Sequence, residues 1–300
     1  MTARRKSEQR KLQQRGSSRM AVGGLIAVVL VIAAGITVAV LVASRAPLEA
    51  TPWARLDTED VHSLAFAGDG TDQILFGHHG GLLASGDGGR TWDPLPVGED
   101  AMSTSTASDG SIVIAGHEVF RASRDGGKTW TSIATDLPSL DIHGFARDPA
   151  DPVRMWAYLA TGGLWESTDG GSTFAQVRSD NVLFPTAIAA ESGTRLFGVD
   201  TTGLIESLDG GRTWSSLAMP PTFPMTSFAA GADGRVLYAG AQDGLYRSED
   251  GGRSWSETAY TGSAFALATS PDGRTVILVD RATDVYRSDD GGATWPGPRR

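Results

Sequence analysis

The sequence has 300 residues, of which 40% are hydrophobic, and it contains no cysteine. This apolar fraction excludes a disordered chain, and the lack of thiols excludes disulfide scaffolds, thiolate zinc sites and cysteine nucleophiles. Of the 26 Lys and Arg residues, eight lie in residues 1–45 beside a single acidic residue, so the rest of the chain carries a net charge of about −16. Such a charge repels nucleic acid, and no nucleic-acid partner is expected.

The N-terminal region predicts a membrane anchor. Residues 20–43 form a stretch of 24 residues without a charge, and a helix of that length covers about 36 Å, against a hydrocarbon core of about 30 Å. Because the basic residues are concentrated before this stretch, the positive-inside rule places the tail 1–19 in the cytoplasm and the remainder of the chain outside. Residues 44–51 are expected to form a spacer. The alternative is a cleaved signal peptide, and whether the anchor is ever removed stays open.

One motif then occurs six times. The copies are SGDGGRTW from Ser85, SRDGGKTW from Ser123, STDGGSTF from Ser167, SLDGGRTW from Ser207, SEDGGRSW from Ser248 and SDDGGATW from Ser288. Their aspartates are Asp87, Asp125, Asp169, Asp209, Asp250 and Asp290, which are 38, 44, 40, 41 and 40 residues apart. A period near 40 with four β-rich segments per unit predicts an all-β, six-bladed propeller over residues 52–300. Residues 52–56 are expected to supply the outer strand of the last blade, which closes the ring.

The motif resembles the Asp-box, or BNR repeat, of sialidases and of bacterial exported propellers catalogued as sialidase-like glycosyl hydrolases. The resemblance implies that the six aspartates have a structural role in turns between the third and fourth strands. It also implies that the innermost strands line a central channel, and that ligands bind at the opposite end. The chain is therefore expected in the bacterial cytoplasmic membrane, as a single-pass protein with its N-terminus inside and its propeller outside.

All five histidines fall on loops expected at that ligand-type end: His62, His78, His79, His117 and His143. Their contexts repeat, because Asp60-Val61-His62 parallels Asp141-Ile142-His143, and because His79 and His117 each lie six residues before the serine of the motif. We take these histidines with Asp60 and Asp141 as candidate ligand-binding residues. Imidazoles that converge at a channel mouth can bind copper or zinc, so His62, His79, His117 and His143 are candidate metal ligands. The alternative is a structural histidine copied from blade to blade, and no cofactor is required.

The functional reading that follows is a membrane-anchored extracytoplasmic binding or assembly module with a glycan or protein partner. The alternative is a glycoside hydrolase of the exo-sialidase type that acts on extracellular glycans, based on the resemblance and on acidic residues of the same loops, Asp100 among them. However, the inner segments hold no arginine cluster, an Arg-Ile-Pro sequence is missing, and no catalytic residue can be assigned. The aromatic residues Phe184, Phe223 and Tyr260, with Met219 and Met225, are expected either to form a docking edge or to cap the core.

Overall fold

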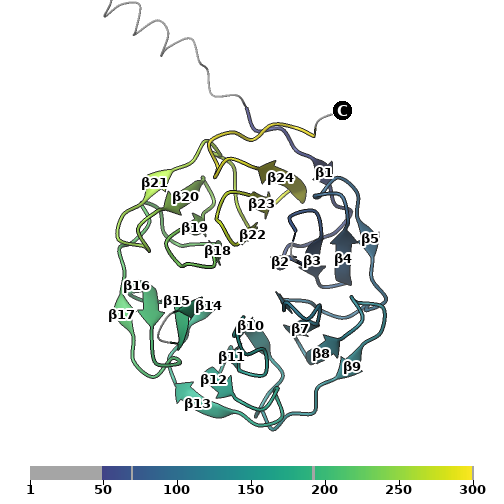
Figure 1. The fold of residues 1–300 in the computed structure, drawn as a ribbon, viewed down its shortest axis with the longest axis vertical. Coiled ribbons are helices and arrows are strands. Elements are labelled where there is room, and N and C mark those ends of the chain that lie inside the picture. Colours follow the sequence, from purple (N-terminus) through teal and green to yellow (C-terminus); the bar gives the residue numbers. More distant parts are fainter. Residues whose placement is uncertain (1–48, 69, 191–192, 299–300) are drawn as a thin grey trace, which may run out of the picture. The chain divides into compact units, whose positions relative to one another are not determined.

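The computed structural model describes residues 49–68, 70–190 and 193–298. Their strands form six four-stranded sheets that are arranged as blades around a central axis (Figure 1). The predicted six-bladed, all-β propeller is therefore confirmed. The predicted tail 1–19 and transmembrane helix 20–43 lie outside the described residues. Within the described part of the chain, no helix has the length and apolar character that a membrane crossing requires.

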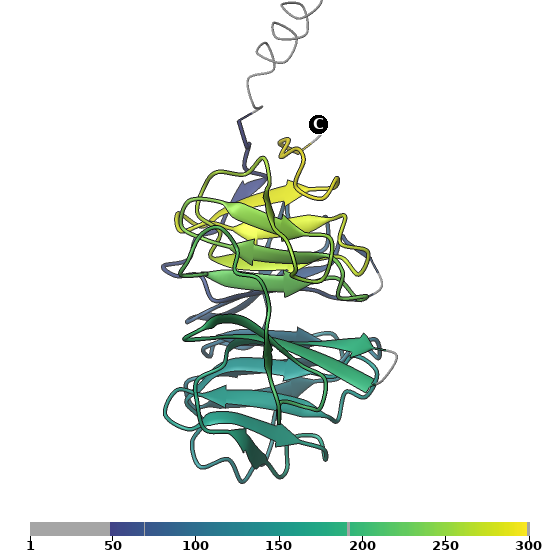
Figure 2. The same ribbon diagram turned by 90° about the vertical axis from the view of Figure 1, so that its left-hand side faces the viewer.

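In the first five blades the chain runs from the innermost strand to the outermost, and Figure 2 shows the stacked sheets from the side of the ring. The first three blades contain β2 (Ser63–Phe66), β3 (Ile74–His78), β4 (Gly81–Ser85) and β5 (Asp93–Pro94); β6 (Ser103–Thr106), β7 (Ile112–Gly116), β8 (Val119–Ser123) and β9 (Thr131–Ser132); and β10 (Ile142–Arg147), β11 (Met155–Leu159), β12 (Gly163–Ser167) and β13 (Ala175–Arg178). The next two contain β14 (Leu183–Ala190), β15 (Gly193–Asp200), β16 (Gly203–Ser207) and β17 (Ser215–Ser216); and β18 (Ser227–Ala230), β19 (Leu237–Gly240), β20 (Leu245–Ser248) and β21 (Ser256–Glu257).

The sixth blade joins the two ends of the propeller. It contains β22 (Ala266–Thr269), β23 (Val276–Val279) and β24 (Asp284–Ser288), and its outermost strand is β1 (Ala54–Arg55). In this pairing Ala54 lies opposite Val285, and the amide of Leu56 donates to the carbonyl of Thr283 at 2.9 Å. The prediction that residues 52–56 supply the outer strand of the last blade is confirmed, and the pairing covers an edge that would otherwise stay open.

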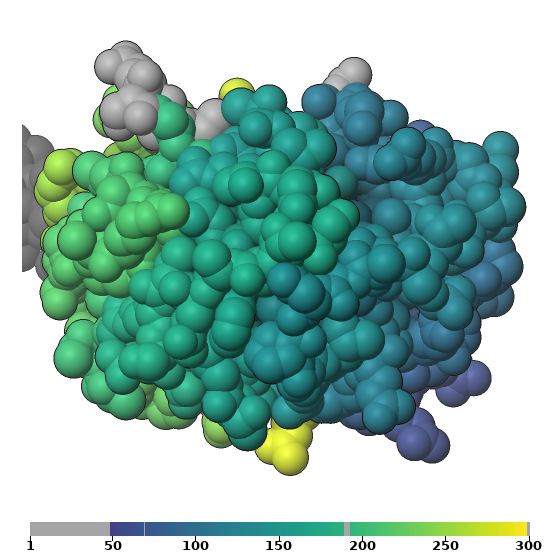
Figure 3. Space-filling model, turned by 90° about the horizontal axis from the view of Figure 1, so that it is seen from below, coloured from purple at the N-terminus to yellow at the C-terminus, as the bar shows by residue number. Residues whose placement is uncertain are grey.

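The apolar core lies between the blades. The buried side chains form six clusters, and each cluster combines residues from two adjacent blades. Ile74 and Phe76 of β3 pack with Ile277 of the sixth blade, whereas Leu75 packs with Ile114 of the second blade. This alternation arises because successive residues of a strand point to opposite faces of its sheet. Figure 3 shows the outside of the ring, where neighbouring blades lie side by side.

The repeated motif forms a Ser-x-Asp-Gly-Gly turn between the third and fourth strands of the first five blades, and directly after the third strand, β24, of the sixth. In the fourth copy, the Ser207 hydroxyl donates to Asp209 Oδ1 at 2.9 Å and accepts from the amide of Gly211 at 2.8 Å. Asp209 also accepts from the amide of Thr213 at 2.8 Å and from its hydroxyl at 2.6 Å. The serine-to-aspartate bond recurs in the other five turns. The motif therefore satisfies its own polar groups locally.

Gly211 shows why the turn needs its second glycine. Its φ is +89°, a region that residues with a side chain rarely adopt. A Cβ placed there would lie 3.2 Å from a methyl carbon of Leu164 in the preceding blade. The turn thus packs closely against the neighbouring sheet.

Ring closure is testable at Leu56, which is 4% exposed and packs between the first and sixth blades. We expect Leu56→Ala to lower the free energy of unfolding by about 2–5 kcal/mol, because it leaves a cavity where the two ends of the propeller meet. Urea unfolding of the full chain, followed by tryptophan fluorescence, measures this. Leu208→Ala is the control, since Leu208 is 60% exposed. Equal stability of the two variants would contradict this account of closure.

The stabilising role of the aspartate in these turns can be tested through the pH dependence of the free energy of unfolding. Hydrogen bonds from Thr213 and Ser207 lower the pKa of Asp209 from 3.8 to about 2. Because the folded-state pKa is depressed, this stabilisation is fully present above about pH 4 and is lost as the pH falls toward 2. We expect Asp209→Asn to be less stable than the native chain at pH 7, with a difference that shrinks between pH 4 and pH 2. Urea unfolding at a series of pH values measures this, with Asp243→Asn, in an exposed turn, as the control. A constant difference across that range would contradict the prediction.

Candidate functional site

All five histidines lie at the end of the ring opposite the Ser-x-Asp-Gly-Gly turns. In an antiparallel blade, the turns between the second and third strands and the links to the next blade share one end. His62 directly precedes β2, His78 ends β3, His79 lies in the turn to β4, His117 lies in the turn between β7 and β8, and His143 is the second residue of β10. We call this the histidine end. The expectation that the imidazoles share one end agrees with the structure.

Four of these side chains form a continuous row across the first three blades. His62 Nε2 lies 2.8 Å from His79 Nδ1. The rings of His79 and His117 are stacked, with their centroids 6.0 Å apart. His117 Nε2 lies 3.2 Å from His143 Nε2. We call these four residues the histidine row, and it links the first, second and third blades.

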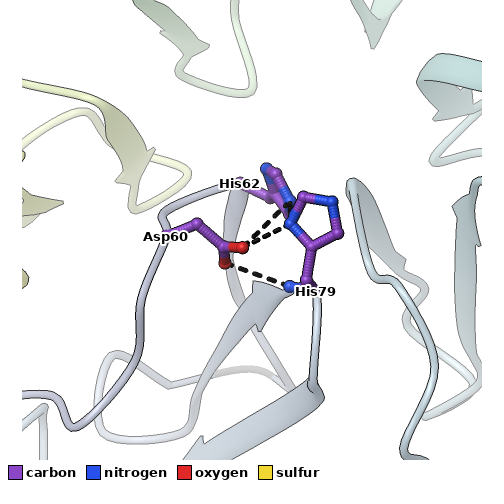
Figure 4. Close-up of side chains that lie close together, drawn as sticks. All are labelled: Asp60, His62 and His79. Atoms are coloured by element: carbon purple, nitrogen blue, oxygen red, sulfur yellow. Dashed lines mark hydrogen bonds and ion pairs between the residues drawn. The ribbon is translucent and has the colours of Figure 1, made fainter.

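Asp60 lies against the first two imidazoles of the row. It accepts a hydrogen bond from the backbone amide of His79 at 3.0 Å and also contacts the ring of His79. Its Oδ2 is 3.9 Å from His62 Nε2. Figure 4 shows the carboxylate directed toward both rings. The sequence expectation that Asp60 accompanies His62 therefore holds, but its hydrogen bonds are made to His79.

Asp141 lies against the other end of the row. Its Oδ1 is 3.0 Å from His143 Nε2 and 3.4 Å from His117 Nε2. Two features of the backbone bring these groups together: an isolated β-bridge pairs Asp141 with His117, and a register shift in β10 falls between Ile142 and Gly144. Asp141 therefore joins side chains from two blades.

Asp100 is a third carboxylate of the row. Its Oδ2 accepts from the backbone amide of His117 at 3.2 Å and lies 2.6 Å from His117 Nδ1. The residue is only 8% exposed, and its Oδ1 has no hydrogen-bond partner among the described residues. This Oδ1 points toward the first blade, where it is 3.5 Å from His62 Nε2.

Sequence analysis included Asp100 only in an acidic rim and did not select it as a site residue. A usable signal was present, because Asp100-Ala101-Met102 lies at the start of its inner strand, as Asp60-Val61-His62 and Asp141-Ile142-His143 do in the first and third blades. Met102 replaces the histidine in the second blade and hides the similarity. Aligning the three blades on their inner strands would have revealed the aspartate.

Electrostatics favour a neutral imidazole at His62 beside a charged carboxylate at Asp60. Burial lowers the pKa of His62 below its usual value and outweighs the attraction of Asp60 and Asp100. Burial acts to raise the pKa of Asp60, but the hydrogen bonds from His79 and the nearby imidazoles lower it overall. At neutral pH His62 is therefore uncharged and has one nitrogen lone pair available, while Asp60 is ionised.

His78 does not belong to the row, although sequence analysis placed it among the candidate ligands. Its ring stacks on Phe76, with centroids 6.1 Å apart, and its Nδ1 accepts from the amide of Gly80 at 3.1 Å. Burial lowers the pKa of His78. Because His78 and Phe76 are two residues apart on one strand, both face the sixth blade, whereas His79 faces the second.

The row borders a cavity of about 300 Å³ at the mouth of the central channel. His62 and His143 contribute to one side of its wall, while Phe184 and Phe265 contribute apolar surface from the fourth and sixth blades. Residues at or near the start of the inner strand of every blade line this cavity. None of the described arginines lines it, so the described wall lacks the cation that recognition of a sialic acid carboxylate uses.

The aromatic loop residues are divided between the two roles considered for them. Tyr260 is 3% exposed and Met225 7% exposed, and both belong to core clusters. For Tyr260 and Met225, the alternative that these residues cap the core therefore holds. Phe184 packs partly against the core and also borders the cavity. Phe223 and Met219 remain exposed.

The arrangement offers three overlapping sets of metal donors. Each set combines imidazole and carboxylate atoms that lie within 4.8 Å of one another, and the sets are Asp60, His62 and His79; His79, Asp100 and His117; and His117, Asp141 and His143. Imidazole with carboxylate is a donor set that suits zinc, copper and other divalent transition metals.

Comparison with solved structures shows the fold. The chain superposes on a GH74 enzyme from Niastella koreensis with a TM-score of 0.54 and 16% identity, over 78% of this chain and 46% of that one. It superposes on YCF48 from Cyanidioschyzon merolae with a TM-score of 0.54 and 18% identity, over 82% of this chain and 88% of that one. It superposes on a structure of YCF48 bound to a D1 peptide with a TM-score of 0.55 and 16% identity, over 80% of this chain and 96% of that one. The chain thus spans less than half of the GH74 enzyme's length. No family model and no curated protein matches the sequence.

Proposed function

We propose that this chain is a membrane-anchored, extracytoplasmic propeller of the Asp-box type that binds a divalent transition-metal ion at its histidine end. The observation that carries the proposal is the histidine row, in which four imidazoles and three carboxylates from three blades converge beside a cavity. The uncharged stretch 20–43 and the basic tail before it support the anchor and the orientation.

The donor atoms at the end of the row have spacings that suit a metal ion. His117 Nε2, His143 Nε2 and Asp141 Oδ1 are separated by 3.2, 3.0 and 3.4 Å. Ligand distances of about 2.0–2.1 Å around a tetrahedral ion place neighbouring donors roughly 3.3 Å apart. Three protein ligands leave one coordination position for a further group. The site is thus built more like a binding or catalytic metal site than a closed structural one.

A second feature supports metal binding over a plain hydrogen-bonded cluster. Two imidazole nitrogens face each other at each end of the row, in the pairs His62–His79 and His117–His143. A proton on one nitrogen of each pair satisfies the hydrogen bond within that pair, but an ionised carboxylate nearby supplies no donor. A cation satisfies nitrogen lone pairs and carboxylate charge together.

The same contacts weaken the glycosidase alternative. A general acid in a glycosidase needs a carboxyl group with a raised pKa. The pKa of Asp60 is lowered instead, and Asp100 and Asp141 both contact imidazoles. The pKa of Asp280 is raised by burial, but its Oδ1 accepts two backbone amides in a turn. A protein partner also remains within this proposal, and its support is that YCF48, which shares the fold, was solved with a D1 peptide.

Calorimetric titration of the full chain in detergent with Zn²⁺ or Cu²⁺ tests the proposal. We expect His143→Ala to weaken binding at the site of His117, Asp141 and His143 at least tenfold, because that substitution removes a direct ligand. His78→Ala is the matched control, since it removes an imidazole at the same end but outside the row, and its binding should match the native chain. Equal isotherms for the native chain and His143→Ala would overturn metal binding at the row.

A further inference from the structure

We propose that the histidine row holds two metal ions and that Asp100 couples the two sites, an inference that rests on the proposed metal binding. The first site consists of Asp60, His62 and His79, all from the first blade. The second consists of His117, Asp141 and His143, from the second and third blades. These two sets share no residue, so both can be occupied at once.

The third set of donors, His79, Asp100 and His117, competes with this arrangement. A single ion at that position would take one ligand from each of the two end sites. Within this set, His117 Nδ1 and Asp100 Oδ2 already lie at a hydrogen-bond distance of 2.6 Å, which is shorter than the roughly 3.3 Å between two ligands of one tetrahedral ion. The row therefore has two alternatives: two ions at its ends or one ion at its centre.

The contacts of Asp100 favour the two ends. When Asp100 Oδ2 accepts the proton on His117 Nδ1, the lone pair of His117 lies on Nε2, the atom that faces His143. A carboxylate that fixes the tautomer of a ligating histidine is a common second contact around metal sites. Asp100 thus prepares His117 to serve the second site.

The other oxygen of Asp100 serves the first site. Its Oδ1 is buried, has no hydrogen-bond partner among the described residues, and lies 3.5 Å from His62 Nε2. A buried ionised oxygen without a partner is costly, because it has lost its water and gained no donor. The separation is close to the roughly 3.3 Å expected between two ligands of one tetrahedral ion. Because Asp100 Oδ1 faces His62, we place it as a fourth donor to the first ion, beside the set Asp60, His62 and His79.

The two sites then differ in what they leave open. Four protein ligands close the first site, while three leave a coordination position at the second. His62 of the first site and His143 of the second both line the cavity at the channel mouth, so the open coordination position, and not the cavity, distinguishes the two sites. We infer that the second ion is the one that meets an external ligand, and that the first holds the row together.

The stoichiometry of Zn²⁺ on the full chain in detergent, measured by calorimetry and by elemental analysis after desalting, tests the inference. We expect two ions per native chain and one each for His62→Ala and His143→Ala, which damage different sites. One ion per native chain would overturn the two-site arrangement but leave metal binding intact. No binding at all would overturn the proposed function itself, so the two failures are distinguishable.

The role of Asp100 has its own test. We expect Asp100→Asn to weaken the first ion at least tenfold, as read from the binding that remains in His143→Ala/Asp100→Asn. The second ion should be retained, because an amide oxygen still accepts from His117. Glu99→Gln is the matched control, since Glu99 lies in the same loop, pairs with Arg121 and loses the same charge. Equal losses in the two variants would overturn the coupling role, and His62→Ala addresses the first site independently should Asp100→Asn fail to fold.

Discussion

The structure depends on burying apolar side chains on both faces of every sheet. A blade that stood alone would expose two apolar faces, and each of the six core clusters in the described residues needs side chains from two neighbouring blades. An open ring would therefore expose one face at each end as well as an unpaired strand edge. The pairing of β1 with β24 removes this exposure, because it places the two ends of the propeller in one sheet.

This constraint gives the two ends of the ring different tasks. The Ser-x-Asp-Gly-Gly turns satisfy their own hydrogen bonds and pack a glycine against the adjacent blade, so their side chains are occupied by structure. The opposite end is under no such demand, and its loops vary from blade to blade. The histidine row lies there, on loops of the first three blades, because all five histidines of the sequence fall in these blades.

The row also shows how blade packing creates a site that no single repeat contains. His79 faces the second blade and His117 faces the third, because each follows the alternation of its own strand. Each histidine thus meets a partner from the next blade or from its own inner strand. The closed ring brings the side chains of the row close to one another, and His62 and His143 of the row also line the cavity at the channel mouth.

The sequence alone determined the number of blades, the closing strand and the end of the ring on which the histidines lie. Those features follow from a local turn motif with a regular period, and the turn is made by residues close together in the chain. Tertiary structure decided which histidines meet. His78 stacks on Phe76 and is not part of the row. Asp100 contacts His117 and is part of it, although Met102 stands where the other two blades have a histidine. Tyr260 is buried. Each outcome depends on which neighbouring blade a side chain faces, and this is set by the twist and packing of whole sheets, which no local motif encodes.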